Sequence, residues 1–374
     1  MRLLFFINTL SNKGGAEKSL LTIAEELANE GNVVAIAANY THPSAYPLPK
    51  NVEYIEKDKG LKSANSYTQL FSKIRNRIVK YKNVRKIIRE YEPDVIISFL
   101  HTNMIEIFLT HGSIPIISSE RNSFDRRLKK KEYIDKYYLN RLFDMVTVFT
   151  RYDKAIIGSK LKHITVMPNA LSNPIVSEEE YNSLFSKRNN ILACGRIGSK
   201  TAKGEYQKGF DLLIKSFAII ADKYPTWDLD IAGEGTEDSI KEMKDIATKC
   251  NVLDRVHFLG FVKDSDSLMK NHAIYVLSSR DEGFGRVVIE AMANGCPVVS
   301  FDCSGPAEII TDRVDGILVN QNNVKMLAKG MAELMEKESR RYAYGLMAIK
   351  NVKRFSMPII INKWNDMFLT LTNK

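Results

Sequence analysis

The sequence predicts an α/β protein with two parallel-sheet domains, and two patterns support this prediction. Short apolar runs of strand length alternate with stretches of helical period from one end of the chain to the other. Such alternation is typical of parallel sheets that helices cover on both faces. The alternation breaks once, between residues 168 and 189, and then restarts. The length of 374 residues fits two domains, since a domain has about 150 residues on average.

The first half of the chain opens with an apolar run at residues 2–7. We interpret this run as a buried strand, because the start of the chain lacks the long apolar region and the small-residue cleavage site of a signal peptide. Residues 15–30 then have helical period. Further strands are predicted at residues 32–37, 94–98, 114–118, 145–149 and 163–167, with helical stretches among them. These elements form a first domain at residues 1–170.

The break in the pattern contains two prolines, several turn formers and an acidic run (PNALSNPIVSEEE). This composition predicts a linker at residues 171–189 and a second domain at residues 190–355. The second domain has predicted strands at residues 190–195, 228–232, 256–259, 273–278, 297–301 and 316–319. Its predicted helices lie at residues 209–222, 236–249 and 285–294, and the last fifty or so residues are also helical in period.

Composition excludes several classes of protein. Hydrophobic residues make up 44% and charged residues 26% of the chain, which excludes disordered and fibrous proteins. No apolar segment reaches the roughly 18 residues that a membrane-spanning helix needs. The four cysteines have neither metal-binding nor redox spacing, so most are expected to be buried thiols in a reducing cytoplasm. The net charge of +10 indicates an anionic partner, such as phosphates, nucleic acid or an acidic lipid surface.

The most informative stretch is the glycine-containing loop and helix at residues 278–297, which follows a predicted strand. Gly283 and Gly285 let the backbone approach a ligand closely. The first turn of the following helix has unpaired N–H groups and the positive end of the helix dipole, so it can hold a phosphate. Glu282 before that turn and Glu290 inside the helix can then accept hydrogen bonds from sugar hydroxyls. Alternatively, Glu282 caps the helix and Glu290 is solvated.

Other loops of the second domain also follow strands. Arg196, at a strand end, and Lys208, at a helix entrance, are two cations within reach of one diphosphate, although a single such residue is more often a solvated charge. The loop at residues 231–235, which ends at Gly235, brings the backbone close to a ligand. The loop at residues 258–263, which includes Val262, offers backbone groups to a flat base.

In the first domain, residues 11–18 (SNKGGAEK) join a strand to a helix. They match neither the G-x-G-x-x-G dinucleotide fingerprint nor a Walker P-loop. The hypotheses of a dinucleotide-binding protein and of an NTPase therefore lose their main support. Gly14 and Gly15 provide a bare backbone turn at a helix N-terminus. Such a turn fits a diphosphate or a reacting sugar held by the other domain.

The chain resembles glycosyltransferase family 4 through an ordered set of motifs. They are GGAE at residues 14–17, GR…QKG at 195–209, AGEG at 232–235, FLGFV at 258–262 and a Glu-x7-Glu element at 282–290. The resemblance covers roughly residues 1–340, and the Glu-x7-Glu element is its most specific part. It implies the GT-B fold, in which two Rossmann-like domains face each other across a cleft. It also implies a C-terminal helix, here residues 356–374, that crosses back to the first domain.

The family's activity is retaining glycosyl transfer from a nucleotide sugar, and its site roles carry over by position. The resemblance implies catalytic roles for Glu282, Arg196 and Lys208: the glutamate contacts the sugar hydroxyls and the two cations hold the diphosphate. Glu290 would bind the ribose hydroxyls. The remaining donor-binding positions are Gly14, Gly15, Gly235, Val262, Gly283, Phe284, Gly285 and Arg286.

The chain departs from the family pattern near the reacting centre. Many relatives have a histidine after a strand of the first domain, where this chain has Glu120 and Arg121. A histidine does occur in the neighbouring loop, at His101. We therefore assign no catalytic histidine and regard His101, Glu120 and Arg121 as candidates for acceptor contact, with a structural role as the alternative.

The implied reaction leaves negative charge on a departing diphosphate, which fixed cations and a helix terminus stabilise. Since no Asp-x-Asp element or histidine cluster occurs in a loop where a metal would be needed, we expect a reaction without metal and without a cofactor. A hydrolase with paired carboxylates is less consistent, because Glu282 and Glu290 are assigned to hydroxyl binding.

Two basic stretches suggest where the protein works. Residues 61–90 contain nine basic residues and one acid, and residues 126–141 contain seven and two. Aromatic side chains are interleaved with them, at Tyr67, Phe71, Tyr81, Tyr133, Tyr137 and Tyr138. Such surfaces suit peripheral docking on the anionic inner face of a plasma membrane, and solvated helical faces are the alternative. Nucleic acid is a weaker partner, because no helix-turn-helix, zinc-finger or RNP pattern is present.

Three function classes follow. The first is a bacterial glycosyltransferase that uses a UDP-hexose or UDP-N-acetylhexosamine to extend a lipid-diphosphate saccharide, as in O-antigen or capsule synthesis. The second is another GT-B enzyme, either a UDP-sugar epimerase or a soluble α-glucan synthase. The third is a non-catalytic basic binding protein.

Overall fold

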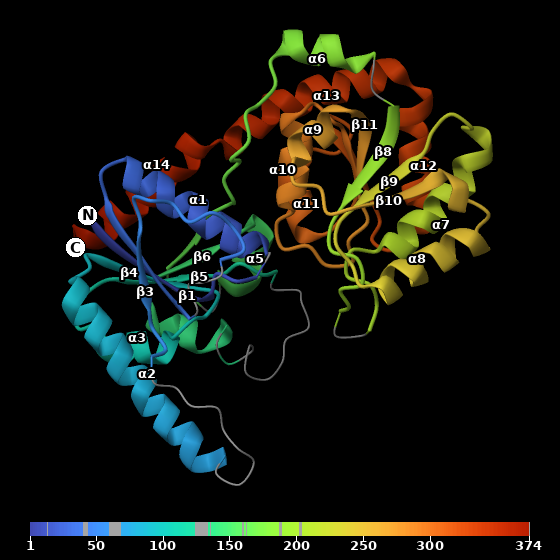
Figure 1. The fold of residues 1–374 in the computed structure, drawn as a ribbon. Coiled ribbons are helices and arrows are strands. Elements are labelled where there is room, and N and C mark those ends of the chain that lie inside the picture. Colours follow the sequence, from blue (N-terminus) through green and yellow to red (C-terminus); the bar gives the residue numbers. More distant parts are fainter. Residues whose placement is uncertain are drawn as a thin grey trace. The chain divides into compact units, whose positions relative to one another are not determined.

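The structure is a computed structural model, which describes residues 1–12, 14–39, 44–59, 69–123, 134, 136–158, 161, 163–186, 189–201 and 204–373. The chain forms two compact units (Figure 1). Unit 1 comprises Met1–Ala170 and Met357–Lys374, and unit 2 comprises Leu171–Ser356.

Unit 1 is built on a parallel sheet whose strand order in the described residues is β3-β2-β1-β4-β5-β6-β7. The strands are β1 (Arg2–Thr9), β2 (Val33–Asn39), β3 (Glu53–Glu56), β4 (Val95–Phe99), β5 (Ile116–Ser119), β6 (Met145–Val148) and β7 (Ile164–Val166). The helical elements are α1 (Gly15–Asn29), α2 (Gln69–Tyr91), α3 (Met104–Thr110), η2 (Leu139–Leu142), α5 (Arg151–Gly158) and α14 (Met357–Thr372). The short strand β3 at the sheet edge was not predicted from the sequence, because its residues EYIE do not form an apolar run.

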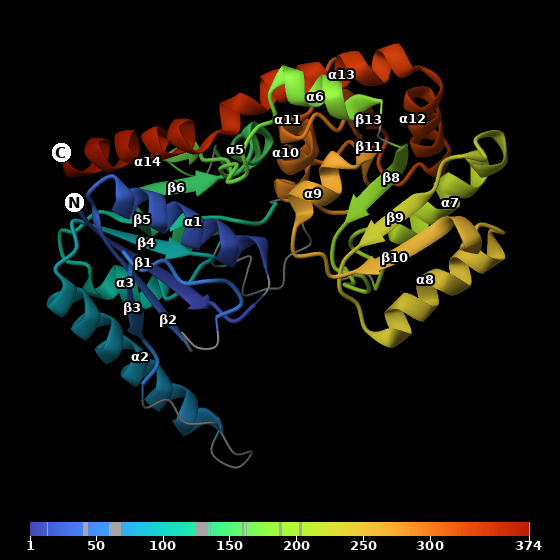
Figure 2. The ribbon, with the colours of Figure 1, turned by 45° about the horizontal axis from the view of Figure 1, so that its top comes forward.

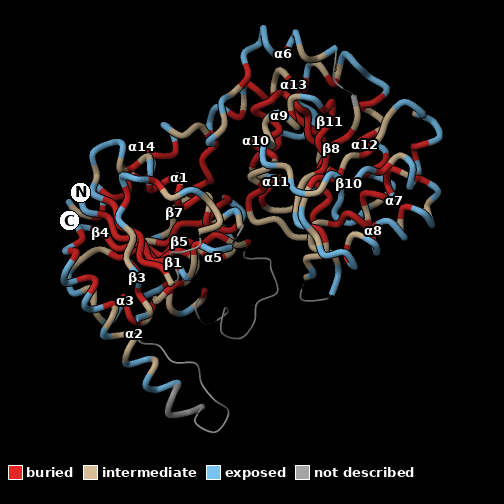
Figure 3. The backbone as a smooth tube through the Cα atoms, in the orientation of Figure 1, coloured by how far each residue is buried: buried red, intermediate tan, exposed pale blue. Residues whose placement is uncertain are grey.

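Helices cover both faces of this sheet because successive side chains of a strand point to opposite faces. Leu3 and Phe5 of β1 pack in one hydrophobic cluster with residues of α1 and α14. Leu4 and Phe6 pack in a second cluster with residues of α2 and α3. Figures 1 and 2 show these helix pairs on the two sides of the sheet, and Figure 3 shows the strands as the buried layer between them.

The C-terminal helix α14 belongs to unit 1 although the rest of unit 1 ends at Ala170. This is the helix for which the sequence led us to expect a return to the first half of the chain. Trp364 is its largest buried side chain, with no exposed surface. The indole ring lies 6.4 Å from the ring of Phe5 and 5.6 Å from that of Phe368, measured between centroids. Burial of this apolar face holds the helix on the sheet.

Unit 2 is built on a second parallel sheet, with the order β10-β9-β8-β11-β12-β13 in the described residues. The strands are β8 (Asn189–Cys194), β9 (Leu229–Ala232), β10 (Val256–Gly260), β11 (His272–Leu277), β12 (Val298–Phe301) and β13 (Gly316–Val319). The α-helices are α6 (Glu178–Phe185), α7 (Phe210–Ile220), α8 (Glu237–Lys249), α9 (Ser265–Lys270), α10 (Arg286–Ala293), α11 (Ser304–Ile309), α12 (Val324–Glu336) and α13 (Glu338–Val352). Short 3-10 turns are η3 (Ala221–Lys223), η4 (Leu253–Arg255) and η5 (Lys353–Phe355).

The segment predicted as a linker at residues 171–189 is instead part of unit 2 and contains α6. Its acidic run is the first turn of this helix, where Ser177 Oγ accepts a hydrogen bond from the N–H of Glu180 at 3.1 Å. Tyr181 is fully buried and donates a hydrogen bond to the carbonyl of Tyr342 in α13 at 3.2 Å. The sequence pattern misled because a capped acidic helix start has the same composition as a polar linker.

No helix in the described ranges is both long and apolar enough to cross a bilayer.

The buried ring of Trp364 yields a test of how α14 is held. We predict that Trp364→Ala lowers the free energy of unfolding by about 3–5 kcal/mol, because it leaves a cavity between α14 and the sheet. Urea unfolding followed by circular dichroism measures this change. Leu369→Ala is the matched control on the same helix, since Leu369 is 49% exposed. Equal effects of the two substitutions would show that α14 is not anchored through Trp364.

Candidate active site

The residues that the sequence singles out in unit 2 lie where the strand order reverses direction. From β8 the chain proceeds to β9 and β10 on one side of the sheet, whereas β11 on the other side of β8 leads to β12 and β13. Ligands of open α/β sheets bind at such a switch point, beyond the carboxyl ends of the strands. Lys208 lies in the segment after β8, and Glu282 lies in the loop after β11, so both come from strands that flank this point.

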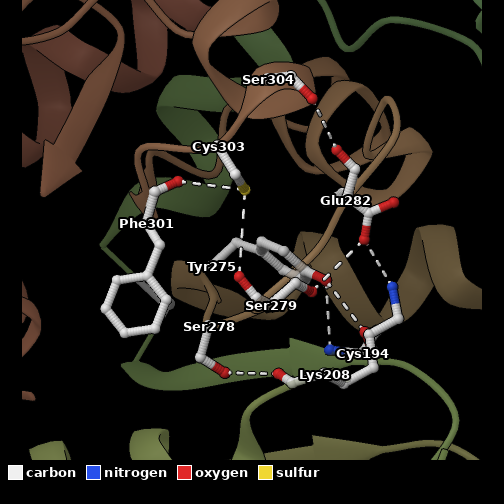
Figure 4. A network of polar contacts seen from close by, with 9 residues as sticks. All are labelled: Cys194, Lys208, Tyr275, Ser278, Ser279, Glu282, Phe301, Cys303 and Ser304. Atoms are coloured by element: carbon white, nitrogen blue, oxygen red, sulfur yellow. Dashed lines mark hydrogen bonds and ion pairs between the residues drawn. The ribbon is translucent and has the colours of Figure 1, made fainter. Parts of the chain in front are cut away.

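Lys208 and Glu282 form an ion pair. Lys208 Nζ donates to Glu282 Oε2 at 2.7 Å, and Ser279 Oγ donates to the same oxygen at 3.4 Å (Figure 4). The two side chains are 23% and 16% exposed, so both remain reachable from solvent. The stem of Lys208 crosses Gly195, where an added Cβ would lie 3.1 Å from three of its methylene carbons. The structure therefore brings together one predicted cation and the predicted sugar-binding carboxylate.

Close backbone contact holds the two loops at this separation. Gly209 has φ +62°, and a Cβ there would lie 1.9 Å from the carbonyl oxygen of Ser278. Only glycine fits such an approach at this backbone angle. Ser278 Oγ in turn donates to the carbonyl of Lys208 at 2.9 Å, as drawn in Figure 4. The position of the ammonium group relative to Glu282 thus follows from the backbone.

Arg280 and Asp211 form a second link between these loops, one that sequence reasoning missed. Both terminal nitrogens of Arg280 donate to the two carboxylate oxygens of Asp211 at 2.7 Å, in a bidentate pair. Arg280 Nη1 also donates to the carbonyl of Tyr206 at 2.7 Å. These hydrogen bonds to Asp211 raise the pKa of Arg280 above its usual value. An arginine after a strand and an aspartate in the first turn of a helix were the available sequence signal.

Helix α10 begins at this site as predicted. Its N-cap is Gly285, at φ +91°. The loop before Gly285 packs closely against α11, since a Cβ on Gly305 of α11 would lie 2.4 Å from the carbonyl oxygen of Phe284. Arg286 Nη2 donates to Glu290 Oε1 at 3.4 Å across one turn. Glu290 is only 7% exposed, so the solvated alternative does not apply to it. The helix N-terminus and Glu282 thus lie at the same loop, which is the arrangement that binding a phosphate and a sugar requires.

A buried tyrosine, Tyr275, lies next to these loops. The backbone N–H of Cys194 donates to the hydroxyl of Tyr275 at 3.2 Å, and burial raises the pKa of Tyr275 well above its usual value (Figure 4). Burial, with the charge of Glu290, raises the pKa of the Cys194 thiol to about 12. Burial, with the charge of Glu282, also raises the pKa of the Cys303 thiol. Both cysteines are free thiols, and these shifts disfavour the thiolate form that a nucleophilic cysteine needs.

Other predicted residues of unit 2 lie on neighbouring loops. Arg196 follows β8 and is exposed to solvent, and no contact to Glu282 is formed by it. The loops after β8 and β9 touch, since a Cβ on Gly233 would lie 1.8 Å from the carbonyl oxygen of Gly195. Gly235 lies against Ile197, and Val262 follows β10 with partial exposure.

The remaining predicted residues lie in unit 1. The turn at Gly14 and Gly15 starts α1, with Gly14 as its N-cap. We expected a bare turn, but a Cβ on Gly14 would lie 2.3 Å from Glu17 Oε2. Asn12 Nδ2 donates to the other oxygen of Glu17 at 3.2 Å. A buried carboxylate therefore lies beside the turn, because a glutamate in the first helical turn is favoured by the helix dipole.

The three acceptor candidates also lie together in unit 1, at the carboxyl ends of β4 and β5. His101 is hydrogen-bonded to Glu120 Oε1, which also accepts from Asn140 Nδ2 at 2.7 Å. Burial acts to raise the pKa of Glu120, but the charges of His101 and Lys136 and the hydrogen bonds outweigh it and hold the pKa below its usual value. Leu100, His101 and Asn103 all have φ near +55°, a conformation that non-glycine residues adopt rarely and mostly at functional sites.

Comparison with known proteins agrees with this architecture. Residues 13–172 match the model described as "Glycosyltransferase Family 4", and residues 186–350 match "Glycosyl transferases group 1". Together the two models span most of the chain. The chain belongs to family 4 of the glycosyltransferases. The protein is accordingly a transferase enzyme.

Two curated relatives and one solved structure illustrate the family. The glycosyltransferase that adds α-1,4-N-acetyl-D-galactosamine to a diNAcBac-PP-undecaprenol saccharide in Campylobacter jejuni is 27% identical, over 100% of this chain and 99% of its own. The amylovoran biosynthesis glycosyltransferase AmsD of Erwinia amylovora is 26% identical, over 98% and 99%. The structure of Anabaena HepE in complex with UDP-glucose superposes with a TM-score of 0.74 at 19% identity, over 99% and 100%. This last likeness shows that the fold is GT-B.

Proposed function

We propose that this glycosyltransferase moves a hexose or an N-acetylhexosamine from a UDP sugar to a hydroxyl of a lipid-linked saccharide during bacterial surface polysaccharide synthesis. The observation that carries the proposal is the Lys208–Glu282 pair beside the N-terminus of α10. A cation, a helix N-terminus and a carboxylate are the three groups that a diphosphate joined to a sugar requires. Relatives support the setting, since the Campylobacter protein acts on an undecaprenol diphosphate saccharide and HepE binds UDP-glucose.

The donor binds by exchange of partners in this proposal. Without a donor, Glu282 neutralises Lys208 at 2.7 Å. When the diphosphate arrives, Lys208 and the exposed Arg196 hold its oxygens, and Glu282 is released to accept hydrogen bonds from the sugar hydroxyls. Glu290 takes the ribose hydroxyls, and the N–H groups around Gly285 receive the phosphate charge. These positively charged and N–H groups then stabilise the negative charge that develops on the leaving diphosphate. Because they are already positioned, they lower the activation barrier of the transfer.

The stereochemistry and the acceptor belong to the same proposal. Transfer proceeds with retention, as the family resemblance implies. His101, Glu120 and Arg121 are the groups of unit 1 that we assign to the acceptor side, because they lie at the carboxyl edge of its sheet, where Glu120 and Arg121 are buried and His101 is hydrogen-bonded to Glu120.

The donor roles are tested by neutral substitutions. We predict that Lys208→Met and Glu282→Gln each reduce donor binding or transfer by about 10- to 100-fold, since each removes hydrogen bonds between charged and polar groups. A thermal-shift panel of nucleotide sugars finds the donor, and a transfer assay with lipid-diphosphate saccharides measures turnover. Lys215→Met and Glu237→Gln, which alter exposed residues of α7 and α8, are the matched controls. Full activity in both site variants would exclude the proposed catalytic centre, and nucleotide-sugar binding without transfer or hydrolysis would favour a non-catalytic protein.

The reaction is proposed to need no metal. The Asp-x-Asp sequence at residues 264–266 is used structurally: Asp264 Oδ1 accepts from the N–H of Ser267 at 3.0 Å, and Asp266 Oδ1 accepts from Asn294 Nδ2 at 2.8 Å. Lys208 and Arg196 supply the positive charge instead. We predict that turnover in the transfer assay is unchanged by excess EDTA. A loss of turnover that Mg²⁺ or Mn²⁺ restores would refute this part of the proposal.

Peripheral attachment to an anionic membrane is proposed through α2. This helix contains eight Lys or Arg residues and a single acid, Glu90, and it exposes Ile74 and Ile78 by 53% and 51%. An exposed basic helix with apolar side chains suits the headgroup region of an acidic bilayer. Parts of the two basic stretches lie outside the described residues, namely residues 61–68 and 126–133, which include Tyr67 and Tyr133. The side chain of Phe71 also lies outside them.

We predict that the double substitution Lys73→Glu with Arg77→Glu weakens binding to vesicles containing anionic lipid by at least about thirtyfold, since each cation contributes about 1 kcal/mol. Co-sedimentation with liposomes at low salt measures the change. Lys241→Glu with Lys244→Glu, on the exposed face of α8, makes the same charge change in unit 2 and serves as the control. If wild-type protein fails to bind anionic vesicles at low salt, the attachment is ruled out.

A further inference from the structure

Unit 1 contains a buried guanidinium group that no carboxylate of the described residues neutralises. Arg121 follows β5 and is 6% exposed. Its guanidinium carbon lies 4.7 Å from the ring centroid of Phe99, 5.0 Å from that of Phe149 and 5.7 Å from that of Trp364. Aromatic faces attract a cation but accept no conventional hydrogen bond in its plane. The group is therefore enclosed by rings from the ends of β4 and β6 and from α14.

The hydrogen-bonding capacity of Arg121 is largely unused. Its Nε donates to Ser119 Oγ at 3.0 Å. Both terminal nitrogens, Nη1 and Nη2, are buried and have no hydrogen-bond partner. Burial lowers the pKa of Arg121 to about 9, and no acidic side chain contributes to offset this. A buried charge without a partner destabilises a fold strongly, so the arginine at this position calls for a compensating species.

The neighbouring glutamate does not supply the compensation. Glu120 points its Oε1 to His101 and Asn140, and the charges of His101 and Lys136 act on it. By contrast, Arg280 and Arg286 of the unit 2 site have carboxylate partners, Asp211 and Glu290, and Arg196 of the same site is exposed to solvent. Arg341 of α13 is also buried and faces an aromatic ring, but its Nη1 donates to the carbonyl of Leu334 at 2.8 Å, whereas neither terminal nitrogen of Arg121 has an acceptor among the described residues.

A second donor beside Arg121 also lacks an acceptor. Trp364 Nε1 is buried without a hydrogen-bond partner, and its ring is one of the three that enclose the guanidinium. Buried polar groups in folded proteins are nearly always hydrogen-bonded, to protein or to a bound species. Arg121 and Trp364 are thus neighbouring side chains whose N–H donors lack acceptors, and Arg121 is a cation. A ligand that satisfies both must accept hydrogen bonds and carry negative charge.

We propose that Arg121 and Trp364 bind an anion inside unit 1, between the carboxyl edge of the sheet and α14. The ligand class is a small anion: a halide, a phosphate, or the carboxylate of an acidic sugar. Its source is either free ions in solution or an acidic group on the acceptor saccharide. The bound anion neutralises Arg121 and ties α14 to the strand ends, so the site links the C-terminal helix to the Glu120–His101 cluster. The site stands whether or not the proposed donor chemistry is correct.

Trp364 reports directly on this site. The chain has two tryptophans, so Trp227→Phe leaves Trp364 as the single emitter. This variant is titrated with bromide, phosphate, acetate and glucuronate, each replacing a bulky sulfonate at constant ionic strength. Trp364 has no exposed surface, so collisional quenching from solvent is weak and linear, whereas occupancy of the site is saturable. We expect a saturable change in emission and a rise in Tm of roughly 5 °C or more at a concentration 100 times Kd.

Arg121→Met, made in the same background, distinguishes site binding from a general salt effect. It keeps the side-chain length and removes the charge, so the saturable response is expected to disappear. In the sulfonate buffer this variant should have a Tm equal to or above that of the parent, because the uncompensated charge is gone. Arg89→Met, an exposed arginine of α2 in the same unit, is the matched control and should keep the full response.

The anions distinguish the two sources. A response to bromide, phosphate and acetate identifies a site for free ions, and a response to glucuronate alone identifies an acidic acceptor sugar. Should Arg121→Met fail to fold, anomalous scattering from a bromide-soaked crystal locates the ion, and a peak at the Arg121 guanidinium is expected. The proposal is overturned if no anion gives a saturable change, if Arg121→Met responds like its parent, or if bromide binds elsewhere only. Donor binding at Lys208 and Glu282 is measured separately, so failure of one proposal leaves the other intact.

Discussion

Close contact between two backbone segments in unit 2 is the constraint on which its candidate site depends. The segment after β8 passes the loop after β11 with Gly209 against the carbonyl of Ser278, and there is no room for a side chain between them. This contact brings Lys208 and Glu282 together, and the bidentate Arg280–Asp211 pair is a second link between the same two segments. The switch in strand order between β8 and β11 makes such a meeting possible, since only there do neighbouring loops lead to opposite halves of the sheet.

Charge balance differs between the two units. Around the unit 2 site, Lys208, Arg280 and Arg286 are paired with carboxylates, whereas Arg196 is exposed to solvent. Lys208 is held by Glu282 and remains reachable from solvent. In the described part of unit 1 the buried Arg121 has aromatic neighbours and no carboxylate partner, while Glu120 is paired with His101. A paired cation favours reversible ligand binding, whereas an unpaired buried cation favours a tightly held counter-ion.

The family and the fold were predictable from the sequence because they rest on local patterns. Apolar runs such as residues 2–7 marked the strands of both sheets, and glycines at positions such as Gly285 marked where a helix starts beside a ligand loop. The misassigned segments have equally physical causes. A capped acidic helix start around Ser177 has the composition of a linker, and the edge strand β3 is too short and too polar to stand out. The glycine turn at Gly14 is not bare, because Glu17 folds back over it.

Local patterns in the sequence specify which residue types follow each strand, and hence the GT-B architecture and the candidate residues Lys208, Glu282 and Glu290. Which of these residues come into contact depends on how the chain folds. In the folded chain Lys208 pairs with Glu282, and Arg196 is exposed to solvent. Arg280 pairs with Asp211, and three aromatic rings surround Arg121. This difference arises because the residues that follow a strand are its neighbours in the sequence. The pairing of charged side chains and their removal from water instead depend on segments up to hundreds of residues apart.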